Sequence, residues 1–233
     1  MIVAGNVLSS SGMMTLSPSA TLADIATRYP AASRVFHGHG LDFCCGGQRP
    51  VGDACAEKGL RVDAVLAEIE SAEAPRDAPR WDERPLAELA DFIQGHYHAR
   101  LRVQLPELVR LAARVEERHA EKATCPRGLT AHLTAVHHAV LDHLAKEEQI
   151  LFPMLRAGRG AQAGGPIHVM EIEHDDHREN LQQTRRLSAD LVAPEEACTT
   201  WRALYLGLLE LERELMEHIH LENNVLFRRA LLA

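Results

Sequence analysis

The stretches HLAKEEQILF, residues 143–152, and HIHLENNVLF, residues 218–227, decide the fold of this chain. Aligned on their first residue, both read His, three residues, Glu, two residues, Ile or Val, and then Leu-Phe. Four residues advance about 400° around an α-helix, so the His and the Glu of each stretch lie on one face. The repeated polar pair predicts two helices that carry the same functional face.

Regularly spaced apolar residues extend both stretches into long amphipathic helices. The spacing alternates between four and three residues, which is typical of the seam of an antiparallel helix bundle. The seam of the earlier helix consists of Leu129, Leu133, Val136, Val140, His143, Glu147, Ile150 and Met154. That of the later helix consists of Leu204, Leu208, Leu211, Leu215, His218, Glu222 and Val225.

Two further helical patterns complete the larger part of the chain. One opens near Pro85 and runs to about His119, and the other begins at Pro166 and ends before Pro194, where the last helix begins. Pro is common at the first position of a helix, and Gly is common just past its end. Four long helices with short connections predict an all-α, up-down-up-down four-helix bundle over residues 84–233.

A smaller helical unit precedes the bundle. Residues 1–20 are expected to be a flexible tail, residues 21–72 a small Cys-containing helical domain, and residues 73–83, with two Pro, a linker. Thr21 and Asp24 resemble the capping pair that opens a helix. A segment this short buries little apolar surface by itself, so we expect it to pack against the bundle.

Composition excludes several classes of protein. The net charge of −8 argues against non-specific binding to nucleic acid or to an acidic membrane surface. No apolar run has the length of a membrane span, and the first twelve residues lack the basic and apolar regions of a signal peptide. Met13 or Met14 could be the true start. A cytoplasmic location is predicted.

The polar residues in the seams predict a metal site. A bare carboxylate inside a bundle core costs several kcal/mol unless it is paired or binds a metal. Glu147 and Glu222 occupy matching core positions, so one shared compensation is expected. The other two helices offer His96 or His98, and His174 or His177, as further ligands. Four His and two Glu suit two bridged metal ions, and this mixture of imidazole and carboxylate ligands favours iron or manganese over structural zinc.

The chain strongly resembles the repair-of-iron-centres family, di-iron proteins with a hemerythrin-like bundle behind a small Cys-containing domain. The motifs that carry the resemblance are LDFCCGG, HYHARLRVQLPEL, HLAKEEQILFPM, VMEIEHD and HIHLENNVLF. The resemblance implies two iron ions joined by an oxo or hydroxo bridge. It places the iron ligands on His98, His143, Glu147, His174, His218 and Glu222, with the two Glu as bridging carboxylates.

Other histidines are expected to lie outside this ligand set. His177 occupies a seam position and could add an outer contact or an exchangeable ligand. His220 is expected to point away from the site as an ordinary surface residue. His137 and His138 are likewise predicted to lie off the ligand face.

Cys44 and Cys45 form an adjacent thiol pair in a Gly-flanked turn, onto which the resemblance also places the family's cysteines. Adjacent Cys are difficult to join without strain, so no disulfide between them is expected. They could be a buried pair without function, or could bind iron or a damaged cluster, or exchange with nitrosyl or disulfide groups. Protonated His37 and His39 nearby would lower a thiol pKa.

The resemblance implies repair of iron–sulfur clusters damaged by nitrosative or oxidative stress. Donation of iron to a damaged cluster is the first hypothesis, with damaged iron–sulfur proteins as partners. A second is reduction of nitric oxide to nitrous oxide, and a third is a module that binds or senses nitric oxide or oxygen. The small domain could also pack across a homodimer.

Overall fold

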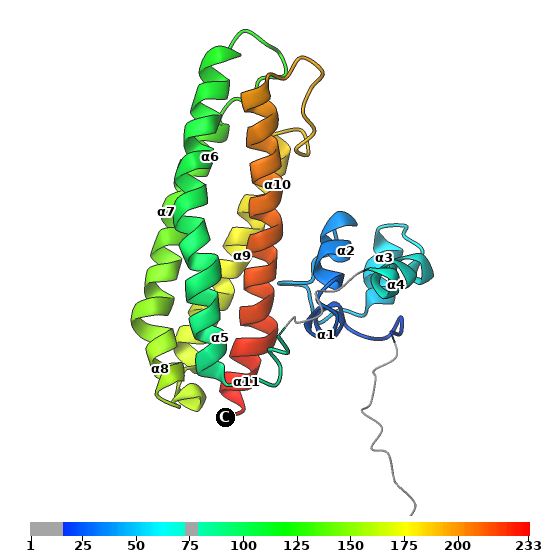
Figure 1. The fold of residues 1–233 in the computed structure, drawn as a ribbon, viewed down its shortest axis with the longest axis vertical. Coiled ribbons are helices and arrows are strands. Elements are labelled where there is room, and N and C mark those ends of the chain that lie inside the picture. The colour runs from blue at the N-terminus through cyan, green and yellow to red at the C-terminus, as the bar shows by residue number, and fades with distance from the viewer. Residues whose placement is uncertain (1–15, 73–78) are drawn as a thin grey trace, which may run out of the picture.

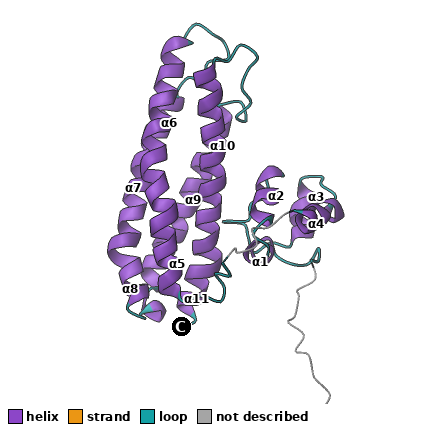
Figure 2. Cartoon of the chain, in the orientation of Figure 1, coloured by secondary structure: helices purple, strands orange, loops and turns teal. Residues whose placement is uncertain are grey.

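The computed structural model describes residues 16–72 and 79–233. Within these ranges helices are joined by loops and no strand forms (Figure 2). A long helical bundle stands beside a small helical domain (Figure 1). The predicted all-α class is therefore confirmed. None of the helices in the described part of the chain is long and apolar enough to cross a membrane.

The bundle consists of four rods that alternate in direction, and three of them are built from consecutive helical segments. The first two rods are α5 (Leu86–Ile93), η1 (Gln94–His98) and α6 (Ala99–Arg118), then α7 (Leu129–Lys146), η2 (Glu147–Leu151) and α8 (Phe152–Arg156). The other two are η3 (Gly160–Gln162) leading into α9 (Gly164–Leu187), then α10 (Thr199–His220), η4 (Leu221–Leu226) and α11 (Phe227–Leu231).

Three rods contain a short π-helical segment, in which each turn holds an extra residue. These segments are η1, η2 and η4. A single π turn within an α-helix frequently marks a functional site. Here the segments contain His98, Glu147 and Glu222, so the irregular turns occur where the predicted metal ligands lie.

The third rod ends earlier than its apolar pattern predicts. The α9 helix stops at Leu187, and Ala189, Asp190 and Leu191 follow with φ of 49°, 58° and 61°. Leu191, which lies before Pro194 and so within the predicted third helix, therefore belongs to a loop, although its side chain still packs on the bundle core. The last rod begins at Thr199, not at Pro194.

The small domain packs four short helices around a core of its own. They are α1 (Leu22–Arg28), α2 (Ala32–Gly38), α3 (Val51–Glu57) and α4 (Val62–Ser71). The Thr21 hydroxyl accepts a hydrogen bond of 3.0 Å from the Asp24 N–H, which confirms the predicted cap. Leu16 and Ala20 pack against this core from the chain ahead of α1.

The small domain also packs against the bundle, as expected from its size. The carboxylate of Glu212 in α10 lies 3.1 Å from His37, and the hydroxyl of Ser33 donates to Glu217 at 3.1 Å. Met216 contacts the apolar cores of both domains. Asn224 in η4 donates to the carbonyl of Cys44 at 2.9 Å, which holds the turn with the adjacent cysteines against a π segment of the bundle.

Candidate metal centre

Six polar side chains from all four rods converge inside the bundle. All are buried, and Glu147, Glu222, His98 and His174 have no exposed surface. These are the six residues that the family resemblance predicts as ligands: His98 at the end of η1, His143 in α7, Glu147 in η2, His174 in α9, His218 in α10 and Glu222 in η4.

The six residues divide into two groups that could each hold a metal ion. His98 and His218 belong to one group, and His143 and His174 belong to the other. Both groups include the same two carboxylates, and the ligand atoms within each group lie within 4.8 Å of one another. Two metal positions that share both carboxylates would be adjacent, as they are when carboxylates bridge a pair of ions.

The carboxylate of Glu147 faces histidines from both groups. Its Oε2 lies 3.3 Å from Nε2 of His98 and 3.6 Å from Nε2 of His143. Neither carboxylate oxygen has a hydrogen-bond partner among the described residues. A buried carboxylate without such partners costs several kcal/mol, so a cation between these groups would offset the cost.

The carboxylate of Glu222 spans the two groups with separate oxygens. Its Oε1 lies 2.8 Å from Nε2 of His218, and its Oε2 lies 3.2 Å from Nε2 of His174. Each oxygen thus lies next to one metal position. This arrangement fits a bridging role better than that of a ligand to one ion.

Outer hydrogen bonds orient two of the histidines. Nδ1 of His98 lies 2.8 Å from the carboxylate of Glu148, and Nδ1 of His143 lies 2.9 Å from that of Glu173. Such partners fix the proton on Nδ1 and leave Nε2 free to bind a metal. Lys146 pairs with Glu173 on the outer side.

Asn223 orients a third histidine and also reaches the small domain. Its Oδ1 accepts from Nδ1 of His174 at 2.7 Å, while its Nδ2 donates to the carbonyl of Cys44 at 3.5 Å. Sequence reasoning missed the three outer partners Glu148, Glu173 and Asn223. Each is nevertheless the immediate neighbour of a predicted ligand in the sequence, which is a usable signal.

The geometry between two of the histidines fits a bound cation. Nε2 of His143 and Nε2 of His174 lie 3.1 Å apart. Because the Nδ1 atoms of both rings are bonded to acceptors, the two Nε2 lone pairs face each other. Two lone pairs at this distance repel each other, and a metal ion that accepts both of them would replace the repulsion with two attractive contacts.

Burial also sets the protonation of the centre. Burial, together with nearby His218, lowers the pKa of His98 to about 4. Burial and the neighbouring charge of Glu222 raise the pKa of Glu147 well above its usual range. Burial alone would raise the pKa of Glu222, but His218 and His174 hold it well below its usual range. Neutral imidazoles are the form that binds metals, and bound cations favour ionised carboxylates.

Two further buried histidines differ in their surroundings. The ring of His177 contacts that of His143 edge to face, with centroids 4.9 Å apart, but His177 belongs to neither group. His220 points away from the centre, as predicted, but the prediction that it is a surface residue is wrong. It is 4% exposed because the small domain covers it, through Thr27 and the carbonyl of Phe43 at 3.3 Å each.

The remaining histidines lie outside the centre. His96 is exposed and stacks on Phe92, with ring centroids 5.1 Å apart. His137 and His138 contact each other and belong to neither ligand group, as expected. The choice of His98 over His96 thus agrees with the burial of the two rings.

The adjacent cysteines lie beside the centre rather than in it. All five cysteines are free, as expected for Cys44 and Cys45, whose sulfur atoms lie 3.9 Å apart. The expectation that His37 and His39 lower a thiol pKa is wrong, because these rings pair with Glu212 and Glu68 instead. The neighbouring Cys45 thiol and burial raise the pKa of Cys44 well above its usual value.

Comparison with known proteins agrees with this architecture. Residues 93–230 match the hemerythrin HHE cation binding domain, and residues 18–73 match a domain of unknown function, DUF542. Over 212 residues the chain is 48% identical to an iron–sulfur cluster repair protein YtfE of Yersinia pseudotuberculosis serotype IB (strain PB1/+). The alignment covers 91% of this chain and 96% of that relative.

The chain belongs to the YtfE family of iron–sulfur cluster repair proteins. A YtfE protein of Yersinia pestis (strain Pestoides F) matches with the same identity and coverage. The hemerythrin match spans all six residues of the candidate metal centre, and the DUF542 match spans Cys44 and Cys45. Both matched domains are therefore present in this one chain, and its buried His and Glu groups could hold a metal ion.

Proposed function

We propose that the buried centre holds two iron ions and that the chain repairs damaged iron–sulfur clusters by donating iron. His98 and His218 would bind one ion, and His143 and His174 the other. Glu147 and Glu222, with an oxo or hydroxo group, would bridge them. The observation that carries the proposal is that the two ligand groups share both carboxylates, in a chain whose relatives are named for cluster repair.

The shared carboxylates suit a centre that releases one ion and keeps the other. If the ion between His143 and His174 leaves, Glu147 and Glu222 still have a cation at the other position. The outer partners Glu173 and Asn223 would keep the vacated histidines in place for reloading. When bound, the iron pair supplies open coordination positions and redox chemistry for small reactive molecules such as nitric oxide.

The direct test is a repair assay. A purified enzyme that depends on a [4Fe–4S] cluster is inactivated with nitric oxide or peroxide and then mixed anaerobically with the iron-loaded chain. We expect client activity to return together with loss of iron from the chain. Glu147→Ala is expected to restore nothing, whereas His138→Ala, at an exposed position, serves as the matched control. Full repair by Glu147→Ala would contradict iron donation from this centre.

The adjacency of the two groups also favours a second candidate, reduction of nitric oxide. Two molecules of nitric oxide, two electrons and two protons give one nitrous oxide and one water, so the reaction needs an external reductant. Continued nitrous oxide production over many turnovers would support this activity. Reversible binding of nitric oxide or oxygen without any product would instead favour a sensing or storage module.

A further inference from the structure

Outside the bundle, the described residues contain one further group of side chains suited to a metal. Asp42, Cys44 and Cys45 each offer a ligand atom, and these atoms lie within 4.8 Å of one another. We propose that these three residues form a second cation site, which takes one thiophilic divalent ion. A role for this site in transiently binding Fe²⁺ that leaves the bundle rests on the proposed function. The binding of a divalent ion by these three residues does not.

The turn places all three ligand atoms together. Oδ1 of Asp42 accepts from the N–H of Cys45 at 3.0 Å and lies 3.3 Å from the sulfur of Cys44. A side chain at Gly47 would meet the carbonyl of Phe43 at 2.5 Å, so only glycine permits this close turn. The carboxylate is thus fixed next to both thiols before any ion binds.

The bundle holds the turn rigidly. Nδ2 of Asn224 donates to the carbonyl of Cys44 at 2.9 Å, and Oδ1 of Asn224 accepts from Gln48 at 2.8 Å. Arg228 in α11 donates in turn to Gln48 at 3.0 Å. A site whose ligands are fixed by outer hydrogen bonds loses little entropy on binding an ion.

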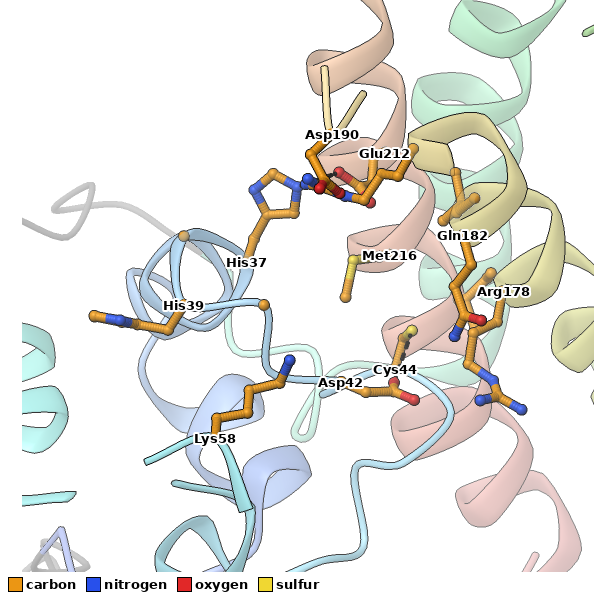
Figure 3. A pocket seen from close by; sticks show the side chains of 15 residues that line it. His37, His39, Asp42, Cys44, Lys58, Arg178, Gln182, Asp190, Glu212 and Met216 are labelled. Atoms are coloured by element: carbon orange, nitrogen blue, oxygen red, sulfur yellow. Dashed lines mark hydrogen bonds and ion pairs between the residues drawn. The ribbon is translucent and has the colours of Figure 1, made fainter. Parts of the chain in front are cut away.

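Charge and access both suit a cation. Two thiolates and one carboxylate around a divalent ion leave one negative charge, which the nearby guanidinium of Arg178 can balance. Burial lowers the pKa of Arg178, but the charges of Asp175, Asp42 and Cys45 raise it overall. Asp42, Cys44 and Arg178 line a cavity of about 480 Å³ between the domains (Figure 3).

The site adjoins one metal position of the bundle. The sulfur of Cys45 lies 3.6 Å from the backbone carbonyl of His174, and Asn223 connects the ring of His174 to the carbonyl of Cys44. The ion between His143 and His174 is therefore the one next to the thiols. With three protein ligands, the second site keeps a position open for a ligand from an acceptor.

Binding at this site is an exchange of protons for a metal. Two S–H bonds break, two sulfur–metal bonds form, and both protons pass to water. No electron is transferred. Soft thiolate ligands favour ions such as Fe²⁺, Zn²⁺ and Cd²⁺ over Mg²⁺ or Ca²⁺.

Cadmium titration of the full, iron-loaded chain tests the site. Cd²⁺ bound to thiolate gives an ultraviolet charge-transfer absorption, which the metal centre in the bundle cannot produce because none of its six candidate ligands is a cysteine. We expect one Cd²⁺ per chain with this absorption and no loss of iron. The double variant Cys44→Ser, Cys45→Ser is expected to lose the absorption. Asp42→Asn is expected to bind Cd²⁺ more weakly by about tenfold or more.

Controls separate this site from the rest of the chain. Cys198→Ser removes an exposed thiol that lies 3.2 Å from His119, and it should leave the titration unchanged. Unaltered iron content in each variant reports that the bundle has folded. Absence of the absorption in the wild-type chain, or its persistence in the double Cys variant, would overturn the site. A cadmium site in a chain that fails the repair assay would instead leave the site standing and refute the proposed function.

Discussion

At the scale of single residues, His177 is buried next to the candidate metal centre without a hydrogen bond to its ring from any described residue. It is 3% exposed, and neither ring nitrogen has a hydrogen-bond partner among the described residues. Because an unsatisfied buried polar group costs about 1–3 kcal/mol, we expect His177→Leu to raise the unfolding free energy of metal-free protein by a similar amount. Urea unfolding of chelator-treated protein measures the change.

His132 provides the matched control for this substitution. Its Nε2 lies 3.0 Å from both the carbonyl of Asn180 and the hydroxyl of Thr184. His132→Leu leaves these groups with one partner fewer, so it should lower the unfolding free energy. Equal destabilisation by His132→Leu and His177→Leu would contradict the view that His177 lacks a structural role.

The residues of the centre could be predicted to different degrees. The His-x-x-x-Glu pairs of the second and fourth rods follow from the duplicated stretches, because seam carboxylates need compensation. The choice between His174 and His177 needed the family resemblance, since both rings are buried. The burial of His220 could not be predicted, because it depends on contact with a turn far away in the sequence.

At the scale of helical elements, the absence of a side chain at Gly207 allows α10 to pack closely against α6. A Cβ atom at this position would lie 2.8 Å from Cδ2 of Leu108. Gly207→Val would force these helices apart or distort the Leu108 rotamer, at a cost of about 1–3 kcal/mol. Thermal unfolding should show a lower midpoint for this variant. A midpoint at or above that of the wild type would show that the contact tolerates the larger side chain.

Helix positions follow from apolar spacing, but helix irregularities do not. The seam of Leu204, Leu208, Leu211 and Leu215 predicts the fourth rod, and these residues are indeed buried. The π segments could not be predicted, because a single extra residue in one turn changes backbone hydrogen bonds without a consistent sequence signal. The early end of α9 was missed because Leu191 continues the apolar pattern into a loop.

At the scale of the whole molecule, an ion-pair cluster joins the small domain to the bundle. Glu212 in α10 accepts from Arg185 in α9 and lies 3.1 Å from His37 in α2. Burial raises the pKa of Glu212, but hydrogen bonds from His37 and Arg185 outweigh it and lower the pKa overall. The stabilisation is therefore present above the unfolded-state pKa and is lost as the pH falls through the folded-state pKa.

Glu212→Gln tests this cluster. At neutral pH we expect it to lower the unfolding free energy by about 1.5–3 kcal/mol, as for other hydrogen bonds to charged groups. The difference from wild type should shrink in acid, because wild-type Glu212 is then protonated. Urea unfolding at several pH values measures both effects. Glu210→Gln, which alters an exposed pair with Arg100, should change the free energy by less than about 1 kcal/mol. A pH-independent loss in Glu212→Gln would contradict the assignment.

The association of the two domains was predicted only in outline. The short length of the first domain indicates that it needs support, but its contact surface depends on side chains such as Ser33 and Glu217 that carry no distinctive sequence pattern. For the same reason, the proximity of Cys45 to His174 could not be predicted from the sequence.

The metal content of anaerobically purified protein is the most direct test of the shared-carboxylate centre. Wild type, Glu147→Ala and Glu222→Ala would be compared, with Glu210→Gln as an exposed control. Because each carboxylate belongs to both ligand groups, we expect two irons per chain in the wild type and the control, and loss of both ions in either Ala variant. Zinc, a single ion, or unchanged iron in the Ala variants would contradict the proposed centre.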